Sequence, residues 1–199
     1  EHPDSADPVE FAGADVALVD EAGRPDLLGR FVRAVASDGT IIADAAPADT
    51  WTTLVTETHP GAIAPRPYLT TLGPTAGLYR VGPVAQVRVG VLQTPKAAEL
   101  QQRWLGSSGS AAAARAIITL HATEVVAELA SGDVLRETDL GGGRPDTAPD
   151  TQPATGLVDS PRGVLAHTYS IDTQGAVTAS RILTPTAQNE HWLATLLAA

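Results

Sequence analysis

Residues 156–189 read GLVDSPRGVLAHTYSIDTQGAVTASRILTPTAQN, and they carry the clearest structural pattern of the chain. The segments VLAHTYSI and AVTASRIL are rich in β-branched and aromatic residues, which favour strands. Between them lies Asp172–Gly175, a run of turn-forming residues that ends in a glycine tolerant of positive φ. We therefore predict an antiparallel hairpin here, followed by a terminal helix over 191–197.

The N-terminal part has the same character on a smaller scale. Apolar residues alternate over 31–35, a period of two that indicates a strand, and residues 37–39 (SDG) supply a tight turn. We predict an antiparallel meander over 14–43. Residues 1–12 begin with a polar, proline-containing stretch and are expected to form a flexible tail. The remainder, 13–199, is predicted to be a single domain.

The middle of the chain favours helices. Residues 111–129 are rich in strong helix formers, and Gly132 follows them. Their apolar residues predict a central helix buried in the core, with the C-terminal hairpin packed against it. A second helix is expected over 96–105. The fold class that follows is α+β.

Three further segments complete the interpretation. Residues 47–58 fit one short helix with a proline in its first turn. Residues 78–91 have an extended, β-branched composition broken at Gly82-Pro83. Residues 141–156 are rich in Gly, Pro, Thr and Asp without periodicity, which predicts a mobile loop.

Composition excludes several classes of protein. Hydrophobic residues make up 43% and charged residues 18% of the 199 residues, which is typical of a globular protein. The net charge of -10, with scattered Lys and Arg, argues against a nucleic-acid partner. No apolar run approaches the roughly 20 residues of a membrane-spanning helix. No leader segment is evident at the start. We expect a cytoplasmic protein without a membrane span.

Cysteine and methionine are both absent. The first absence excludes disulfides, thiolate metal ligands and a cysteine nucleophile. The second suggests a processed chain or part of a longer one. The five histidines show no ligand spacing such as HxxH or HExxH, so we predict no metal-binding residues in this chain.

The segment DSPRG at 159–163 is the strongest candidate for chemistry. Pro161 fixes its own φ and Gly163 frees the next, so the turn presents the Arg162 guanidinium at a fixed angle. The alternative is a structural arginine paired with Asp159 or Asp172. Likewise, Thr186–Asn189 fits a helix-capping segment whose side chains bind backbone donors.

Two of these motifs resemble the large subunit of nickel–iron hydrogenases. Residues 156–189 are similar to the family pattern G-x-x-E-A-P-R-G-x-L-x-H-x-Y-x-x-D-x-x-G-x-I, followed by a strand and A/P-T-x-Q-N. Residues 77–87, GLYRVGPVAQV, resemble G-x-Y-R-V-G-P-L-A-R-x-N, whose last position is Arg88 here. Residues 18–44 look like the β-rich insertion of the soluble, cofactor-coupled members. The resemblance covers about 13–195 and implies the hydrogenase large-subunit fold.

The resemblance implies roles for matching positions. Arg162 matches the arginine that hangs over the bimetallic centre, where it moves protons or polarises hydrogen, and Pro161 lines the same pocket. Thr186 matches a residue whose hydroxyl donates to the cyanide ligands of the iron. His167 matches a histidine of the hairpin with a packing or supporting role.

The chain also departs from the family pattern. The family holds its metals with four cysteines in C-x-x-C pairs, and none is present here. Soft thiolates suit such metals, and carboxylates or imidazoles do not replace them. Near the motifs, Gln86 stands in place of an arginine, Arg88 of an asparagine, Ile118 of a glutamate and Asp159 of a glutamate.

Three functional hypotheses follow. The first is a hydrogenase-like protein without a nickel–iron site, acting as a non-catalytic scaffold or partner subunit of a redox complex, beside an iron–sulfur small subunit. The second is the central portion of an active large subunit whose cysteine-bearing ends lie outside this chain. The third is an enzyme of another class that binds an anion at Arg162. In the first two, this chain alone is expected not to turn over hydrogen, and the nickel–iron centre is expected only with the missing cysteine segments.

Overall fold

Strand β1 (Ala14–Val19) is the centre of the fold, because all six of its residues are buried. Val16 and Leu18 lie in the larger of the hydrophobic clusters, whereas Ala17 and Val19 pack on Val89 from the other side. The sequence ADVALV suits this position because a strand covered on both faces needs apolar residues at nearly every position. The structure, a computed structural model, describes residues 10–26, 28–107, 109–132 and 151–198.

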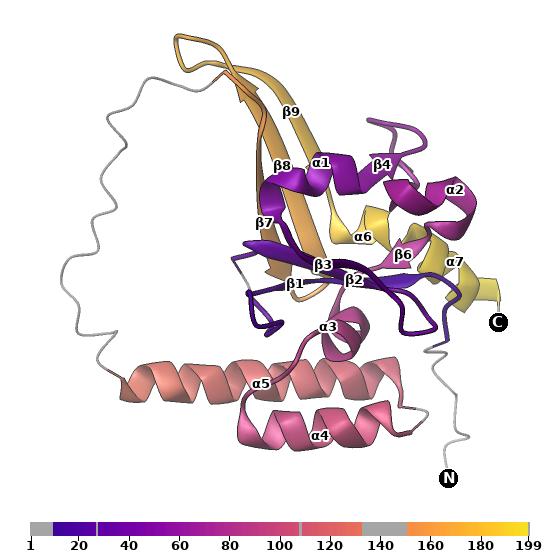
Figure 1. The fold of residues 1–199 in the computed structure, drawn as a ribbon, viewed down its shortest axis with the longest axis vertical. Helices are drawn as coiled ribbons and strands as arrows, with labels where there is room; N and C mark the ends of the chain where they lie inside the picture. The colour runs from indigo at the N-terminus through magenta and orange to yellow at the C-terminus, as the bar shows by residue number, and fades with distance from the viewer. Residues whose placement is uncertain (1–9, 27, 108, 133–150, 199) are drawn as a thin grey trace.

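A four-stranded sheet forms around β1 (Figure 1). Strand β2 (Phe31–Val35) pairs antiparallel with β1, and β3 (Ile41–Pro47) pairs antiparallel with β2. The predicted meander over 14–43 is thus confirmed and runs four residues further. On the opposite edge of β1 lies β6 (Tyr79–Arg80), which pairs in parallel and brings a distant segment into the sheet.

The C-terminal hairpin is part of a second sheet of three strands. Strands β8 (Gly163–Ile171) and β9 (Val177–Leu183) flank the predicted turn, in which the Asp172 N–H donates to the Ala176 carbonyl at 2.9 Å. Strand β7 (Ala154–Ser160) adds to the other edge of β8. The end of the predicted loop, 154–156, is therefore strand, while 141–150 lie outside the described residues.

This second sheet packs against β1 and not, as predicted from the sequence, against the long helix. Leu157, Val164 and Leu183 share one buried cluster with Val16 and Leu18. In Figure 1 the sheet β7–β9 and the helices α4 and α5 lie on opposite sides of the four-stranded sheet. The predicted packing was wrong because periodicity identifies an apolar face without identifying what covers it.

The helical layer consists of α3 (Pro83–Val89), α4 (Pro95–Leu105) and α5 (Ala111–Ser131). Helix α3 lies between the sheet and the other two helices (Figure 1). The prediction of extended structure over 78–91 was wrong after Arg80. Pro83 occupies the first turn of α3, where its missing N–H has no intrahelical partner to lose. The two helices over 96–105 and 111–129 are confirmed.

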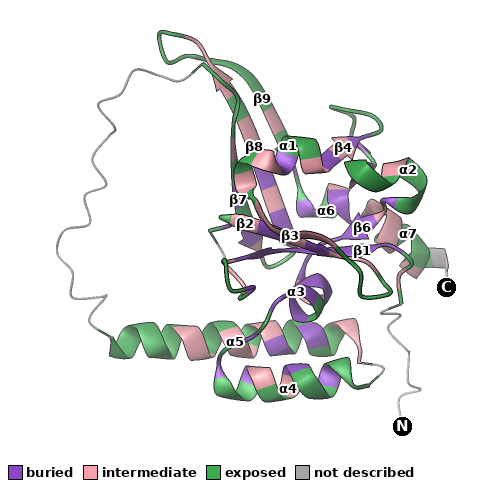
Figure 2. Cartoon of the chain, in the orientation of Figure 1, coloured by how far each residue is buried: buried purple, intermediate pink, exposed green. Residues whose placement is uncertain are grey.

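The long helix α5 is less buried than its composition suggested. Only Ala114 and Ile117 are buried, and Val126 and Leu129 remain 63% and 46% exposed. Figure 2 shows the exposed second half. The cause is length: α4 has 11 residues and α5 has 21, and the start of α4 already binds Glu124 of α5, so the turns of α5 after Val125 extend beyond α4. The prediction of burial therefore fails for these last turns.

Short elements connect the layers. The segment 47–58 is not one helix, because Val55–Glu57 pair with a second strand as β4. The terminal helix predicted over 191–197 is confirmed as α7.

None of the described helices is long and apolar enough to cross a membrane. The connecting and terminal elements are η1 (Ala48–Thr50), α1 (Trp51–Leu54), β4 (Val55–Glu57), β5 (Pro67–Leu69), η2 (Thr70–Leu72), α2 (Gly73–Ala76), α6 (Pro185–Gln188) and α7 (Glu190–Ala198).

One charge interrupts the apolar strand β1, and it is neutralised inside the protein. Arg80 Nε lies 2.6 Å from Asp15 Oδ1, and both side chains are almost completely buried. Arg88 of α3 approaches the same carboxylate at 3.3 Å. The Arg80 guanidinium lies 5.4 Å from the centre of the Phe11 ring and 5.3 Å from that of Trp192. These stacks favour a cation that has left water.

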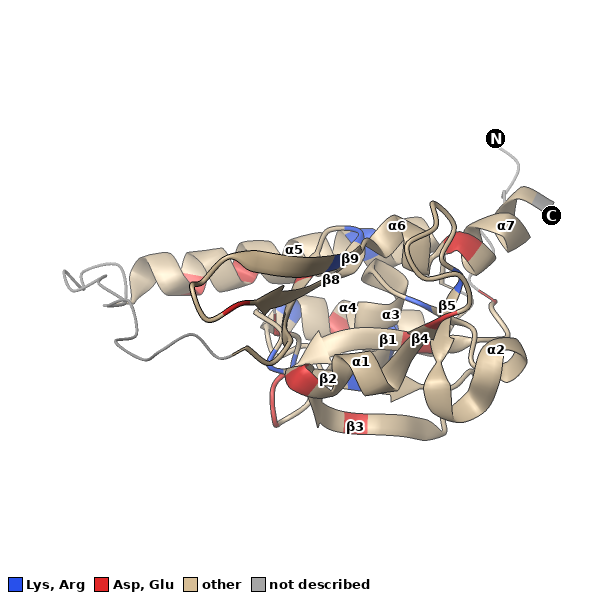
Figure 3. Ribbon diagram, turned by 90° about the horizontal axis from the view of Figure 1, so that it is seen from above, with Lys and Arg blue, Asp and Glu red and all other residues tan. Residues whose placement is uncertain are grey.

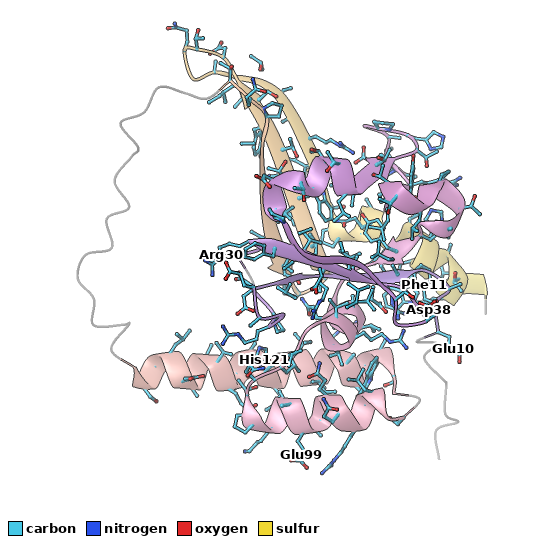
Figure 4. The ribbon with its side chains drawn as sticks, viewed as in Figure 1. Glu10, Phe11, Arg30, Asp38, Glu99 and His121 are labelled. Atoms are coloured by element: carbon cyan, nitrogen blue, oxygen red, sulfur yellow. The ribbon has the colours of Figure 1, made fainter. Side chains whose placement is uncertain are left out.

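Phe11, labelled in Figure 4, therefore belongs to the packed structure although it falls within the predicted tail. Residues 1–9 of that tail lie outside the described residues. Elsewhere, basic and acidic residues are interspersed along the described part of the chain, as the coloured ribbon of Figure 3 shows. One ion pair there joins the exposed Arg24 to the half-buried Asp20.

Replacing Arg80 tests the buried pair. The variant Arg80→Met should lower the free energy of unfolding by about 3–5 kcal/mol, because it leaves the Asp15 carboxylate buried without its closest partner. The matched variant Arg88→Met should cost less than about 1 kcal/mol, because that side chain is 36% exposed and Arg80 still pairs with Asp15. Urea denaturation measures both. Equal losses would contradict a central role for Arg80.

Candidate functional site

Three segments that are distant in sequence meet at the start of α3. They are the passage from β6 to α3 at 79–83, the turn between β7 and β8 at 160–163, and the segment of α6 with its following residue at 185–189. Each contains residues of the motifs singled out in the sequence. The structure therefore joins the motifs into one site.

Asn189 holds the passage from β6 to α3. The Val81 N–H donates to Asn189 Oδ1 at 2.8 Å, and Asn189 Nδ2 donates to the Val81 carbonyl at 3.1 Å. Both residues are buried, so neither backbone group has water as an alternative partner. One side chain thus satisfies both hydrogen-bonding groups of Val81 and fixes its position relative to α7.

Gln188 joins the same passage to the second sheet. The buried Tyr79 hydroxyl donates to Gln188 Oε1 at 3.1 Å. Gln188 Nε2 in turn donates to the carbonyls of Val164 and Leu183, at 2.5 and 3.3 Å. Burial, with a smaller contribution from the negative charge of Glu57, raises the pKa of Tyr79 well above its usual value. The hydroxyl is therefore a donor throughout the neutral range.

The turn at 160–163 lies directly against this passage, and two glycines allow the approach. Gly82 has φ of 104°, and a Cβ on it would lie 2.7 Å from the Arg162 carbonyl oxygen. Gly163 has φ of 119°, and a Cβ there would lie 2.6 Å from the Gly82 nitrogen and 2.5 Å from Val81 Cγ2. No other residue type fits either position without displacement of the backbone or of Val81.

Within the turn, Ser160 stabilises the backbone that carries Arg162. Its hydroxyl donates to the Gly163 carbonyl at 2.8 Å and accepts from the Arg162 N–H at 3.3 Å. Pro161 and Arg162 are both exposed at the tip. The turn is thus rigid at its base and presents the arginine side chain outward.

The Arg162 guanidinium makes no ion pair or hydrogen bond to any of the described residues. Asp172 Oδ1 accepts the N–H groups of Gln174 and Ala176, each at 2.9 Å, within its own turn. Asp159 is buried behind the turn. The alternative of a structural arginine paired with either aspartate is therefore wrong.

The other predicted site residues lie at different places. Thr186 is exposed on α6, and the side chain that caps this helix is that of Thr184, which accepts from the Ala187 N–H at 3.3 Å. His167 lies four residues along β8 from Gly163, about 13 Å at the rise of a strand. Its Nδ1 is 2.7 Å from the Tyr169 hydroxyl. The contact with Tyr169 makes His167 part of the outer face of the sheet.

The residues that the structure describes include no ligand set suited to a nickel–iron centre. The chain contains no cysteine, and the described residues include no group of three or more His, Asp or Glu placed to hold a metal ion. Arg162 is a cation and the Thr186 hydroxyl a weak ligand, so the chemistry of these groups does not fit direct coordination. What they offer is positive charge and hydrogen-bond donors.

A cavity of about 500 Å³ lies elsewhere, between α4 and α5. Its walls are mostly apolar, with Trp104 and Ile117 among the lining residues. Neither Arg162 nor Thr186 lines it, so it does not supply the substrate pocket required by the hypothesis of an anion-binding enzyme.

Tyr79, Gly82, Gln188 and Asn189 complete the site, although the sequence assigned no role to the first two and only a helix-capping role to Gln188 and Asn189. These residues could have been found from the sequence because they lie inside the two blocks that resemble the family pattern, GLYRVGP and PTAQN. A pairing of these blocks in space follows only from the fold, because 108 residues separate Val81 from Asn189.

Comparison with known proteins identifies the class. The fold resembles that of an NAD+-reducing [NiFe]-hydrogenase solved in the H2-reduced state, with a TM-score of 0.77 and 26% identity over 94% of this chain and 43% of that one. A Ni-Fe-Se hydrogenase from Desulfovibrio vulgaris shares the fold at a TM-score of 0.59 and 14% identity, over 94% of this chain and 45% of that one. This chain is therefore a hydrogenase-related protein with an α+β fold of the [NiFe]-hydrogenase type. No protein-family model matches it.

Curated relatives agree with this class. One is a component of the F420-non-reducing hydrogenase vhu of Methanococcus voltae, 30% identical over 84% of this chain and 41% of that protein. The beta subunit of the NAD-reducing hydrogenase HoxS of Cupriavidus necator is 37% identical over 63% and 27%. An iron-sulfur subunit of the F420-non-reducing hydrogenase of Archaeoglobus profundus is 32% identical over 59% and 25%. The chain thus spans between a quarter and two fifths of these relatives.

The two-glycine contact can be tested with a matched pair of variants. Gly163→Ala should lower the free energy of unfolding by about 3 kcal/mol or more, because strain at positive φ adds to overpacking against Val81 and Gly82. Gly175→Ala also places alanine at positive φ, 82°, but nothing lies within 4 Å of its Cβ. It should cost only about 1–2 kcal/mol. Equal thermal shifts for the two variants would disprove the close approach.

Proposed function

We propose that this chain is the central portion of a hydrogenase large-subunit-like architecture and acts as a scaffold that presents Arg162 to a redox site without itself holding a nickel–iron centre. The observation that carries the proposal is an unpaired, exposed guanidinium, without a partner among the described residues, at the tip of a turn fixed by three separate segments. A side chain with no structural partner on such a rigid support is arranged for a ligand or partner.

The partner that fits this role is an iron–sulfur subunit of a hydrogenase-type complex. One relative is itself named an iron-sulfur subunit, and others are named as subunits of hydrogenases, so the relatives belong to multi-subunit enzymes. Large-subunit character is supported by the two motif blocks and by their pairing in the fold. Pro161 lies beside Arg162 at the tip of the turn, whereas Thr186 on α6 and His167 on β8 would have supporting roles from other elements. A cytoplasmic location stays a prediction.

A second candidate is a segment of an active nickel–iron large subunit whose cysteines lie in other segments. The observation that favours it is coverage, because this chain matches only 41% of the Methanococcus voltae relative. In the first candidate Arg162 contributes charge to a redox site that this chain does not hold, and in the second it contributes charge beside a nickel–iron centre held by other segments of the same subunit. Sequencing the coding region on both sides distinguishes them, since flanking C-x-x-C segments would establish the second.

Metal analysis tests the scaffold directly. The chain purified from cells supplied with nickel and iron should contain no stoichiometric nickel and show no hydrogen uptake, because it has no thiolate ligands. Co-expression with the iron–sulfur subunit of a related hydrogenase should give a complex that co-purifies. Stoichiometric nickel in the chain alone would refute the proposal, as would failure to bind any such subunit.

A stability measurement separates a functional Arg162 from a structural one. Arg162→Gln should change the free energy of unfolding by less than about 0.5 kcal/mol, because the side chain is exposed and has no partner among the described residues. Arg181→Gln is the matched control, since Arg181 lies 3.2 Å from the buried Glu57 carboxylate. Its loss should cost about 1–3 kcal/mol. A large loss of unfolding free energy in Arg162→Gln would show that Arg162 has a structural role.

A further inference from the structure

Behind the Arg162 turn, two buried oxygen atoms lack hydrogen-bond partners. Asp159 of β7 is 6% exposed and Gln86 of α3 is 5% exposed. Asp159 Oδ1 and Gln86 Oε1 have no partner in the part of the chain that the structure describes. Both atoms are acceptors when the aspartate is ionised, so neither can satisfy the other. What these two oxygen atoms lack is a hydrogen-bond donor between them.

The surroundings of Asp159 provide little to stabilise a negative charge. The Leu18 N–H donates to Asp159 Oδ2 over a long 3.5 Å. Burial raises the pKa of Asp159 to about 6, although hydrogen bonding with the Gln86 side chain and with Leu18 acts in the opposite direction. A buried carboxylate without a cation is costly to maintain, and protonation removes that cost.

No positive charge on the neighbouring described elements pairs with the Asp159 carboxylate. Arg88 of α3 is directed to Asp15 of β1, and the exposed Arg162 extends from the tip of the turn. None of these groups is among the causes that set the pKa of Asp159. The charged or titratable groups on the elements packed around β7 are Asp15 (β1), Asp26 and Arg30 (before β2), Asp49 (η1), Arg88 (α3), Arg162 (the turn) and His167 (β8).

We propose that Asp159 carries a proton in the folded protein and donates it to Gln86 Oε1, and that this neutral pair positions the turn that presents Arg162. One proton supplies the donor that both oxygens lack. The protonation state of Asp159 can be tested by itself. Its importance for function rests on the role proposed for Arg162.

The pair reaches Arg162 through both supports of the turn. Asp159 pairs with Val164 in the ladder of β7 and β8, immediately before Ser160 and Gly163 close the turn. Gln86 lies one helical turn after Gly82, and the Gln86 N–H donates to the Gly82 carbonyl at 2.8 Å. Gly82 is the residue that contacts the Arg162 backbone. The pair therefore links the strand in front of the turn to the helix behind it, and ionisation of Asp159 weakens that link.

The sign of the pH dependence follows from the pKa difference. The unfolded chain releases the Asp159 proton near the ordinary pKa of 3.8, whereas the folded chain retains it to about 6. The folded state thus binds more protons across this window, so stability falls as pH rises from about 4 to about 6. Each pKa unit is tenfold, so the unfolding equilibrium constant rises about a hundredfold through this group between a pH well below 4 and a pH well above 6.

The experiment is a carboxyl-carbon NMR titration of the wild-type chain, with amide signals of Gly82 and Gly163 followed in parallel. The Asp159 signal should titrate with a midpoint near 6. The Gly82 and Gly163 amides should shift with the same midpoint, because the turn responds to the proton. The Gly175 amide, in the distant β8–β9 turn, should not follow it.

Asp159→Asn supplies the matched variant, since its amide is a permanent neutral donor. It should abolish the hundredfold change and the shifts at Gly163, whereas Asp49→Asn, at an exposed position, should leave both intact. A midpoint near 4 for Asp159 in the wild type, or titration without movement of Gly163, would overturn the inference. The wild-type titration decides even if the variant does not fold. It is independent of nickel content and subunit binding, so its failure would leave the proposed function standing.

Discussion

The backbone contact between Gly82 and Gly163 is the constraint on which the rest of the molecule depends. At this point the end of the four-stranded sheet, the start of α3 and the first residue of β8 share one small volume. Side chains cannot enter it, so the surrounding polar groups of Val81 are satisfied by Asn189 from the C-terminal segment. The same contact holds the turn that carries Arg162 against the start of α3. The candidate site therefore depends on this close approach of two backbone segments.

Strand β1 explains why the two layers form around that contact. A strand buried on both faces must bring apolar partners to each, and here the second sheet covers one face while α3 covers the other. The charge of Asp15 then needs a cation within the core, which Arg80 supplies from the adjacent parallel strand. Such a pair adds little net stability but penalises any register in which the two charges do not meet. It thereby specifies the position of β6, and β6 leads directly into Gly82.

The parts of the fold and of the site that could be predicted from the sequence are those specified by interactions between residues close together in the chain. The meander and the C-terminal hairpin followed from alternation and turn residues, both of which act between neighbours. The segment LYRVGPVAQVRVGV indicates extended structure because valine recurs in it, yet Pro83 begins a helix there and tertiary packing overrides the weak propensity of valine. The extent of burial of α5 was not predictable, since it depends on the length of α4. The paired motifs were visible as sequence, but their contact across 108 residues was not.

Phe11 and Trp192 both approach the Arg80 guanidinium, at 5.4 and 5.3 Å from their ring centres. Residues from the first and last parts of the described chain thus contact one buried cation, which lies in the two-residue strand β6 at the edge of the four-stranded sheet. The packing of both parts depends on the same side chain, so they are energetically coupled although they are far apart in the sequence.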